Sequence, residues 1–211
     1  YAAADMALLM KKKDDYQYFA RRADFYKNLF DKSTNFMRPR LSTGEWKSPF
    51  NPSALAHAES DGGDYTEGNA WQYTWHVQHD VPGLIQLFGG SKPFIAKLDS
   101  FFTTKLNSTL CDVTGLIGQY AHGNEPSHHV AYLYALAGKP ERTQELVREI
   151  IETQYLPKPE GLCGNDDCGQ MSAWYMLSSM GFYPVDPVSA RYVFGAPQLP
   201  QVTLHLPNGK T

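Results

Sequence analysis

The stretch VAYLYALAGKPERTQELVREIIETQY, residues 130–155, decides the fold. Up to Ala137 it is apolar and aromatic on every side, as is typical of a helix that is buried all round. After Gly138, Pro140 stands near the first turn of a second helix, where its missing N–H is tolerated. Four aliphatic residues at helical spacing form one face of this second helix: Leu146, Val147, Ile150 and Ile151. We therefore predict a helical hairpin with an apolar inner member and an amphipathic outer member.

Three more amphipathic helices are predicted upstream, beginning at Asp14 or Asp15, at Asp80 and at Ser91. Asp80 and Ser91 are residues of the N-cap type, and Gly89–Gly90 ends the second of these helices. The apolar face of the first comprises Tyr16, Phe19, Ala20, Ala23, Tyr26 and Phe30. The apolar face of the third comprises Phe94, Ile95, Leu98, Phe101 and Phe102.

Helices of the inner type are predicted at Gly68–Val77, at Val130–Ala137 and directly after Asp167. Alternation of inner and outer helices with short links is typical of stacked helical hairpins, as in solenoids and closed barrels. No fixed-period repeat is visible, which favours a closed barrel with specialised loops over a regular solenoid. The predicted fold class is therefore mainly α, a toroid of helical hairpins.

Two segments break the helical pattern. Residues 32–66 are rich in Pro, Gly, Ser and Asp, and their internal aromatic residues favour an ordered, functional loop. From Tyr183 onward the stretches YPVDPVSARYVFG and QVTLHLP are alternating and β-branched, so strands are predicted there. We expect residues 1–182 to form the helical part and residues 183–211 to form a β-strand segment at its edge.

Composition argues against several classes of function. The chain has 211 residues and a net charge of −3, which disfavours the basic surface that nucleic acid requires. It has no apolar run long enough to span a bilayer. It begins YAAADMALLM, without the basic flank of a signal peptide, and we expect both of its ends to be cut rather than natural. Three cysteines are too few for a disulfide scaffold; Cys163 and Cys168 could pair across their loop, and Cys111 is expected to be buried.

Three polar clusters share one layout, because each stands at the mouth of an inner-type helix. They are DYTEGNAWQYTW with Glu67, GNEPSHHVAYLY with Asn124 and Glu125, and GNDDCGQMSAWY with Asp166 and Asp167. A closed barrel of hairpins points the starts of its inner helices at one face, so we expect these side chains to converge on one pit. Helix capping is the alternative for each cluster taken singly, but it does not explain the glycines and aromatic residues around all three.

Paired carboxylates beside aromatic side chains are what glycoside hydrolysis needs. One carboxylic acid protonates the leaving oxygen, and a carboxylate activates water or attacks the sugar. Aromatic walls such as Trp71 and Trp174 hold the apolar face of a sugar and raise the pKa of an acid by excluding water. His128 and His129 are adjacent at a helix start, so at most one of them faces the pit, where it could bind a sugar hydroxyl.

These clusters offer ligands of two kinds, thiols for zinc and oxygens for calcium. Zinc bound through Cys163 and Cys168 is disfavoured, because four residues separate them and the third cysteine is remote. Calcium fits better, since carboxylates, Asn side chains and loop carbonyls are its ligands. Asn124, Glu125 and Asn165, with the aspartates, supply these oxygens. The sequence has no P-loop, no dinucleotide fingerprint and no serine-elbow motif.

Three long blocks resemble signature blocks of glycoside hydrolase family 92, the calcium-dependent exo-acting α-mannosidases of bacteria. They are YTEGNAWQYTW, GNEPSHHVAYLYALAGKPERTQELVREI and GLCGNDDCGQMSAWYMLSSMGFYPV, in this order. The resemblance runs over essentially the whole chain, from KKKDDYQYFARRADFYKNLFD to VFGAPQLPQVTLHLPNG. It implies an N-terminal β-sandwich followed by an (α/α)6 toroid. Residues 1–182 then correspond to the later part of the toroid, and residues 183–211 to strands that belong to, or lead back to, the sandwich.

The resemblance also implies roles for individual residues. It implies an inverting mechanism on terminal α-linked mannose, with Glu67 as the general acid, Asp167 as the general base and Asp166 assisting. It implies Ca²⁺ as the cofactor, in a pocket lined by Asn124 and Glu125, which match the calcium- and substrate-binding motif. The remaining residues expected at the substrate are His128, Trp71 and Trp174.

Linkage, partners and location follow from the same resemblance. A His directly before the Glu of the second motif is associated with α-1,2 specificity in the family; here that residue is Asn124, which leaves α-1,3, α-1,4, α-1,6 or mixed activity open. The expected partners are an α-mannosyl glycan and the β-sandwich and earlier hairpins of the same full-length protein, and the expected location is secreted, periplasmic or cell-surface. Two alternatives stay open: a non-catalytic carbohydrate-binding toroid, and another hairpin-toroid glycosidase of different sugar specificity.

Overall fold

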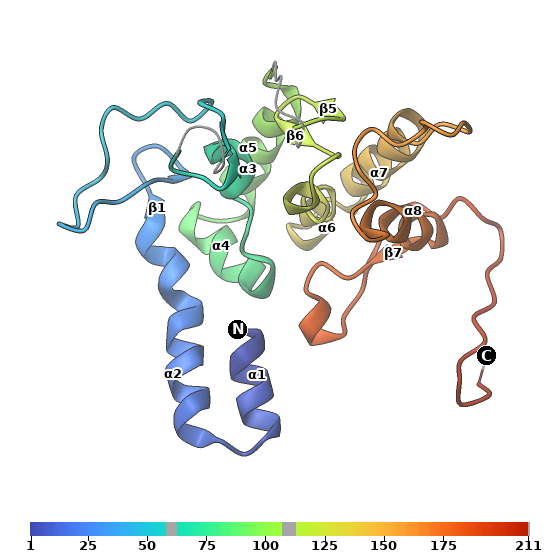
Figure 1. Cartoon of the computed structure of the whole chain (residues 1–211), viewed down its shortest axis with the longest axis horizontal. Helices are drawn as coiled ribbons and strands as arrows, with labels where there is room; N and C mark the ends of the chain where they lie inside the picture. Colours follow the sequence, from blue (N-terminus) through green and yellow to red (C-terminus); the bar gives the residue numbers. More distant parts are fainter. Residues whose placement is uncertain (58–62, 107–112, 211) are drawn as a thin grey trace.

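A computed structural model describes residues 1–57, 63–106 and 113–210, so Cys111 lies outside the described residues. It shows a helical body that carries short β-ladders on its loops (Figure 1). The α-helices are α1 Ala2–Leu9, α2 Lys13–Ala23, α3 Ala70–Tyr73, α4 Val81–Leu87, α5 Ser91–Thr103, α6 Leu133–Leu136, α7 Pro140–Gln154 and α8 Gln170–Met180. The 3-10 turns are η1 Asp24–Leu29, η2 Gln78–Asp80, η3 Glu125–Ser127, η4 Val130–Tyr132 and η5 Pro187–Ser189.

The strands pair antiparallel, two by two. The pairs are β1 Phe30–Asp31 with β2 Phe36–Met37, β3 Ala56–His57 with β4 Glu67–Gly68, β5 Leu116–Ile117 with β6 Tyr120–Ala121, and β7 Phe182–Tyr183 with β8 Val193–Phe194. Among the described helices, none has the length and apolar character needed to cross a bilayer.

The hairpin predicted from residues 130–155 is confirmed, with one difference. α7 begins at Pro140, and its four predicted aliphatic residues are all buried. The predicted inner helix is divided into η4 and α6, because the hydroxyl of Thr143 on α7 enters its backbone ladder. This hydroxyl donates to the carbonyl of Ala131 at 2.8 Å and accepts the N–H of Ala135 at 3.0 Å, the two groups that a continuous α-helix would join to each other.

The ends of α4 and α5 follow their sequence signals only in part. The carboxylate of Asp80 accepts the N–H of Gly83 at 2.9 Å, so the predicted N-cap of α4 is confirmed. Gly89 and Gly90, with φ of 90° and 116°, follow the end of α4 as predicted. Ser91 as the N-cap of α5 is wrong: Gly90 holds that position in a conformation suited to glycine, and Ser91 is already the first helical residue.

The predicted helix Gly68–Val77 is much shorter in the structure, where α3 covers four residues. A capping box starts it: the side chain of Asn69 accepts the N–H of Gln72, and the side chain of Gln72 accepts the N–H of Asn69. Beyond Tyr73 the backbone tightens, with the N–H of Trp75 bonded to the carbonyl of Gln72 at 3.4 Å. The ring of Trp75 thereby enters the core.

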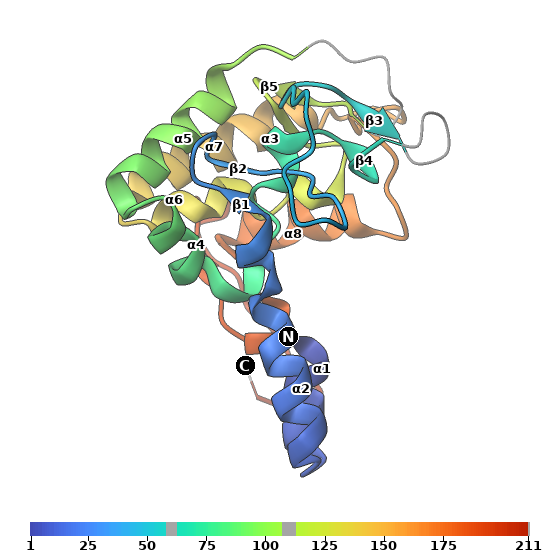
Figure 2. The same cartoon turned by 90° about the vertical axis from the view of Figure 1, so that its left-hand side faces the viewer.

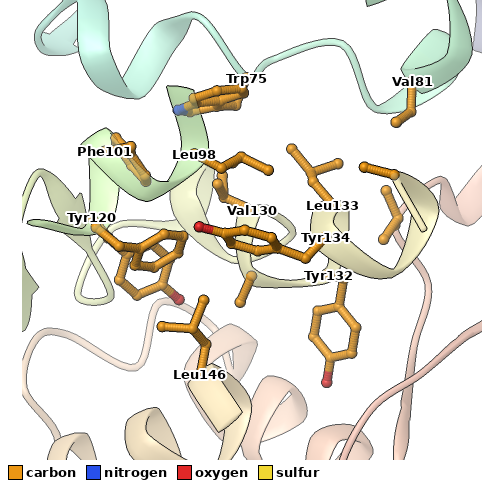
Figure 3. Packing of buried hydrophobic residues seen from close by; sticks show 14 of the residues in the cluster. Trp75, Val81, Leu98, Phe101, Tyr120, Val130, Tyr132, Leu133, Tyr134 and Leu146 are labelled. Atoms are coloured by element: carbon orange, nitrogen blue, oxygen red, sulfur yellow. The ribbon is translucent and has the colours of Figure 1, made fainter. Parts of the chain in front are cut away.

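The hydrophobic core lies between α5, the η4–α6 segment and α7. Figure 3 shows Trp75, Leu98 and Phe101 facing Tyr134 and Leu146 across it. All five side chains are fully buried. Burial of one such side chain stabilises a fold by roughly 1.5–3 kcal/mol, so this cluster gives the polar loops above it a rigid base.

The helices α1 and α2 form an antiparallel hairpin that projects from the body (Figure 2). α2 begins at Lys13, next to the predicted start, but none of its residues is fully buried. Its predicted apolar face is only half-buried up to Tyr26. Large apolar side chains of the preceding segment are exposed: Met6, Leu8, Leu9 and Met10.

The strands predicted after Tyr183 are confirmed only in part. β7 and β8 form a ladder, and Val185, Val193 and Ala196 pack on the helical core. The predicted strand in QVTLHLP is wrong for this chain, because residues 201–206 are exposed and form no ladder. A strand needs a partner for its backbone N–H and C=O groups, and none of the described residues offers one.

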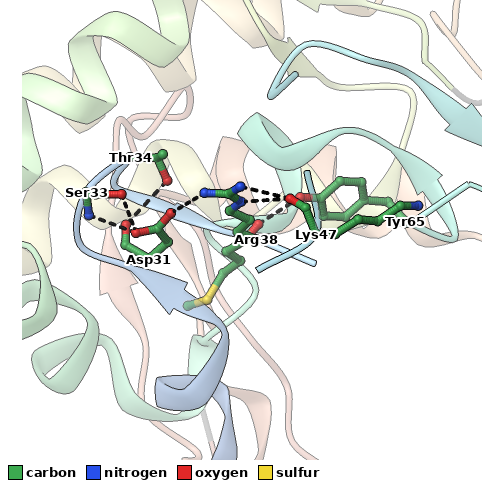
Figure 4. Close-up of polar contacts among 7 residues, drawn as sticks. Asp31, Ser33, Thr34, Arg38, Lys47 and Tyr65 are labelled. Carbon is green, nitrogen blue, oxygen red and sulfur yellow. Dashed lines mark hydrogen bonds and ion pairs between the residues drawn. The ribbon is translucent and has the colours of Figure 1, made fainter. Parts of the chain in front are cut away.

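The described part of the long segment 32–66 is ordered, as predicted. Figure 4 shows its anchor, where the carboxylate of Asp31 accepts the N–H of Ser33 at 2.9 Å and the guanidinium of Arg38 at 2.9 Å. Arg38 also donates to the carbonyl of Lys47 at 2.8 Å. Burial alone would raise the pKa of Asp31, but these hydrogen bonds outweigh it and lower the pKa to about 2.

Candidate active site

Carboxyl groups from the three polar clusters lie close enough to interact. Glu67 lies on β4, Glu125 begins η3, and Asp167 lies in the loop before α8. Burial raises the pKa of Glu125, and a hydrogen bond with Asp167 and the negative charges of Asp167 and Glu67 raise it further. The structure therefore brings together three residues that are far apart in the sequence.

The backbone around Glu67 is set by the glycine and asparagine that follow it. The N–H of Glu67 donates to the hydroxyl of Tyr73 at 3.2 Å. Gly68 has a φ of 86°, and a Cβ at this position would clash with the side chain of Gln72. Asn69 then caps α3. The motif thus combines a tight turn with a helix start, which fixes the backbone beside the carboxylate.

Glu125 carries an atom without a partner. Its Oε1 is buried and makes no hydrogen bond with any described residue. Asn124, which is 6% exposed, precedes it at the N-cap position of η3, and its side chain makes no capping hydrogen bond to that turn. A buried acceptor without a partner costs free energy, so such an atom marks a place where a ligand can supply a donor or a cation.

The two adjacent aspartates serve different purposes in the structure. Oδ1 of Asp166 accepts the N–H and the hydroxyl of Ser172, both at 2.9 Å, so Asp166 caps the first turn of α8. Asp167 has a φ of 45°, a left-handed conformation in which its side chain meets Glu125 instead. The capping alternative therefore applies to Asp166, and Asp167 is the residue that reaches the other carboxylates.

Two glycines bring the loops of Glu125 and Asp167 into direct contact. A Cβ at Gly164 would lie 2.8 Å from the Cα and 2.9 Å from the carbonyl oxygen of Gly123. A Cβ at Gly123 would clash with the hydroxyl of Thr114. The backbones therefore touch without any side chain between them, which explains why both motifs begin with glycine.

A cavity of about 440 Å³ lies beside Glu125. Its lining includes His128 and Trp174, which the sequence placed at the substrate, together with Gln170 and Tyr183, which it did not. Trp71, Glu67 and Asp167 are not among the described residues that line it. Trp71 lies apart from this cavity: its indole N–H donates to Ser53 at 3.2 Å, and the ammonium of Lys97 lies 4.3 Å from the centre of its ring.

The predicted histidine and tryptophan ligands are packed and hydrogen-bonded. Nε2 of His128 bonds to the carbonyl of His122 at 2.9 Å, and Nε2 of His129 bonds to the carbonyl of Trp75 at 2.7 Å. Burial lowers the pKa of His128 to about 4 and that of His129 to about 3, so both rings are neutral at pH 7. Trp174 is fully buried and donates to the carbonyl of His128 at 3.0 Å.

Sequence reasoning missed a polar layer beneath the two loops. Its central residues are His122 and Tyr155, joined by a hydrogen bond of 2.7 Å. His122 directly precedes the Gly-Asn-Glu motif, so its position was a usable signal. Tyr155 follows the outer helix α7, and nothing in the local pattern distinguishes it from a core aromatic residue.

The donor atoms of the described residues bear on both metals considered from the sequence, zinc and calcium. Cys163 and Cys168 are free thiols, and burial raises the pKa of Cys163 to about 11, which disfavours the thiolate that zinc requires. In the described part of the chain, no three His, Cys, Asp or Glu side chains are arranged as a metal site. The unpartnered oxygen of Glu125, next to the buried amide of Asn124, nevertheless supplies the hard oxygen chemistry that suits Ca²⁺.

Several known proteins are similar to this chain. A family model described as the glycosyl hydrolase family 92 catalytic domain matches residues 1–211. A family GH92 alpha-mannosidase from Bacteroides thetaiotaomicron is 47% identical, with a TM-score of 0.88 over 98% of this chain and 27% of that chain. A family GH92 inverting mannosidase from Bacteroides thetaiotaomicron VPI-5482 is 38% identical, with a TM-score of 0.83 over 100% of this chain and 30% of that chain.

A more distant relative is a protein of Arthroderma benhamiae described as an uncharacterized secreted glycosidase. It is 28% identical over 217 residues, which are 94% of this chain and 26% of that protein. The chain therefore spans less than a third of the length of these relatives. Because the family model covers the chain from its first residue to its last, residues 1–211 belong to glycosyl hydrolase family 92.

Proposed function

We propose that the full-length protein containing this chain is an exo-acting, inverting α-mannosidase that removes terminal α-linked mannose from glycans. The observation that carries the proposal is the meeting of Glu67, Glu125 and Asp167, with Glu125 and Asp167 hydrogen-bonded to each other. Carboxyl groups with different proton affinities are what glycoside hydrolysis requires. The similarity to mannosidases of the family supports mannose as the sugar.

In this proposal Glu67 is the general acid and Asp167 is the general base. Protonated Glu67 gives its proton to the glycosidic oxygen, so the rest of the glycan departs as a neutral alcohol. The carboxylate of Asp167 takes a proton from a water that attacks the anomeric carbon on the opposite face. Inversion follows because this single displacement forms the new bond opposite the one that breaks.

Two neighbouring carboxyl groups support Asp167. The side chain of Glu125 is hydrogen-bonded to that of Asp167, and this contact helps to orient the base. Asp166 assists by holding the loop, since its carboxylate is occupied by Ser172. In this proposal Asp166 positions the loop and Asp167 takes part in the reaction.

The same proposal assigns the surrounding residues to the substrate. Asn124, Glu125 and His128 bind sugar hydroxyls, and the cavity shared by Glu125 and His128 supports this. Trp174 forms an apolar floor under that cavity rather than a stacking surface, because its ring is buried. Trp71, which is partly exposed, contributes an apolar wall beside Glu67.

Ca²⁺ is the proposed cofactor, held by Asn124 and Glu125. When bound, it polarises the sugar hydroxyls that it contacts and offsets the negative charge of the carboxyl cluster. The unpartnered Oε1 of Glu125 supports this assignment, because that oxygen needs a donor or a cation.

The proposal extends to the organisation and location of the full-length protein. Residues 1–182 form the later part of an (α/α)6 toroid, and residues 183–211 form the edge segment that leads to an N-terminal β-sandwich. The low share of each relative that this chain covers supports further domains. Secretion, or placement in the periplasm or at the cell surface, is supported by the relative described as secreted.

Hydrolysis of linkage-defined mannobiosides by the full-length protein tests the function. We expect turnover of α-1,3, α-1,4 or α-1,6 mannobiosides in preference to α-1,2, because Asn124 stands where α-1,2 enzymes have His. A calcium chelator should lower the rate, and added Ca²⁺ should restore it. Proton NMR of the first product should show β-mannose; α-mannose would indicate retention, and no hydrolysis of any mannobioside would overturn the proposal.

A further inference from the structure

Tyr155 touches both loops of the proposed active site, although it lies outside all three motifs. Its backbone pairs with Leu162, just before the loop that carries Asp167. Its hydroxyl donates to the carbonyl of Met171 at 3.0 Å, just after that loop. One residue therefore holds both ends of the segment 163–169.

The same hydroxyl reaches the loop of Glu125 through His122. Nε2 of His122 lies 2.7 Å from the Tyr155 oxygen, and His122 directly precedes the segment 123–127 that carries Glu125. At its other end this segment is closed by His128, whose Nε2 bonds to the carbonyl of His122 at 2.9 Å. The loop of Glu125 is therefore pinned at both ends as well.

The directions of these hydrogen bonds follow from elementary donor rules. A backbone carbonyl only accepts, so the Tyr155 proton is committed to Met171. The Tyr155 oxygen must then accept the Nε2–H of His122. With Nε2 as the donor of a neutral imidazole ring, Nδ1 of His122 is an acceptor and takes the hydroxyl proton of Tyr120 at 2.7 Å. The chain from Tyr120 to Met171 therefore runs in one direction, without an unpaired donor.

A second bond joins the loop ends at the other side. The side-chain amide of Gln170, the first residue of α8, lies 3.3 Å from Nδ1 of His128. Nε2 of His128 is already the donor to a carbonyl, so Nδ1 accepts the amide N–H of Gln170. Hydrogen bonds thus connect the ends of both loops, and the Gly123–Gly164 contact joins the two loops near their N-terminal ends.

We propose that Tyr155 is a positioning residue for the hydrolytic reaction, whose hydroxyl fixes the Glu125 loop and the Asp167 loop relative to each other through His122 and Met171. The proposal rests on the proposed function, because it assigns Tyr155 to that same site. Tyr155 touches no substrate in this role. It acts through the geometry of the carboxyl groups, and a misplacement of about 1 Å at a reacting group can lower a rate by about 100-fold.

Tyr155→Phe in the full-length protein is the direct test. It removes the hydroxyl and leaves the ring, which lies parallel to Trp174 with an interplanar angle of 2°. We expect kcat to fall by about 10- to 100-fold, with a smaller rise in KM, because the reacting groups lose their alignment and the binding residues of the Glu125 loop are loosened. Hydrogen–deuterium exchange of the backbone amides in 123–128 and 163–169 should become faster.

Tyr132→Phe is the matched control. The Tyr132 hydroxyl donates to Ser178 at 2.8 Å inside the core, and its ring stacks on Tyr183; among the described residues, no hydrogen bond or ring contact joins its side chain to either loop. We expect a comparable loss of thermal stability in both variants and an unchanged kcat in Tyr132→Phe. Equal kcat values for the two variants would overturn the proposal.

A pair of substitutions at His122 separates positioning from simple packing. Gln places an amide N–H near the site of Nε2 and can still donate to Tyr155, whereas Asn places its amide near Nδ1 and cannot reach Tyr155. We expect His122→Gln to retain several-fold more kcat than His122→Asn, and equal loss in both would contradict the proposal. Exchange of 163–169 is measured without substrate, so it still tests the positioning role if the wild-type protein hydrolyses no mannoside; unchanged exchange in Tyr155→Phe would overturn that role.

Discussion

The carboxyl groups of Glu125 and Asp167 share a hydrogen bond, although they come from loops on different hairpins. Burial raises the pKa of Glu125, and the neighbouring negative charges of Asp167 and Glu67 raise it further. The surroundings of Glu125 thus make its carboxyl group a weaker acid than an ordinary glutamate.

Glu67→Gln should abolish catalysis without unfolding the protein. Gln has nearly the same shape but no proton to give, so kcat on an α-mannoside should fall by about 100- to 10,000-fold. Thermal melting and inhibitor binding should stay close to wild type, because the Glu67 N–H to Tyr73 bond is a backbone contact. A non-catalytic sugar-binding protein would behave identically before and after the substitution, which distinguishes the two classes of function.

Substitutions at the two aspartates should separate their roles. Asp167→Asn should lower kcat by about 100-fold or more with little effect on unfolding, since it removes the base and keeps the volume. Asp166→Ala should cost about 1 kcal/mol in the free energy of unfolding, because the cap on Ser172 is lost. Urea denaturation and steady-state kinetics on both variants check this. An unfolding cost in Asp167→Asn as large as that in Asp166→Ala would contradict the division.

Gly164→Ala should damage activity because its new methyl group meets backbone, which cannot yield as a side chain does. The Cβ would lie 2.8 Å from the Cα of Gly123, so the loops of Glu125 and Asp167 would have to separate. We expect kcat to fall by more than about 10-fold. Gly195→Ala is the control, since its Cβ meets only the side chain of Tyr132, at 3.0 Å. Equal activity in the two variants would show that the backbone contact is unimportant.

The ion pair of Asp31 and Arg38 should make stability depend on pH in the acid range. The pKa of Asp31 is about 2 in the folded state, against an ordinary value near 3.8 in the unfolded chain. A depressed pKa contributes stability that is fully present above about pH 4 and is lost as the pH falls toward 2. The contribution is about 2 kcal/mol. Denaturation of wild type and Asp31→Asn at pH 7 and pH 2.5 should show a difference in unfolding free energy that shrinks at the lower pH; a constant difference would contradict the assignment.

Residues 1–211 expressed alone should not hydrolyse α-mannosides efficiently. The chain spans less than a third of its relatives, and the apolar side chains of the α1 segment, such as Leu9, remain exposed. We therefore expect the remainder of the full-length protein to supply further contacts to the sugar. Calcium-dependent release of mannose by the isolated chain, measured beside the full-length protein, would contradict this expectation.

Helix pairing and convergence of the motifs could be predicted because they depend on local patterns. Leu146 and its neighbours are buried because apolar residues at helical spacing form one face of a helix, and that face packs on the core. The break at Ala131 could not be predicted, because Thr143 reaches it from another helix. Likewise, the different roles of Asp166 and Asp167 depend on the left-handed backbone conformation of Asp167, which the sequence pattern does not predict.

The supporting layer was hidden for a similar reason. His122 and Tyr155 form their hydrogen bond only when two hairpins pack together, so no local spacing in the sequence predicts it. Strand prediction failed at QVTLHLP for the opposite reason. Its alternation is a genuine local preference, but a ladder also requires a second strand, which the described residues do not provide.

The contact between Gly123 and Gly164 acts as a spacer whose thickness is fixed by two backbones. Side chains can adopt other rotamers or be exchanged during evolution, but a spacer made of main chain offers no such freedom. If the proposed function holds, residues that line the adjacent cavity, such as Leu177 and Tyr183, can therefore change which sugar is admitted while the reacting groups keep their spacing. Substrate choice and reaction geometry therefore depend on different residues of the chain.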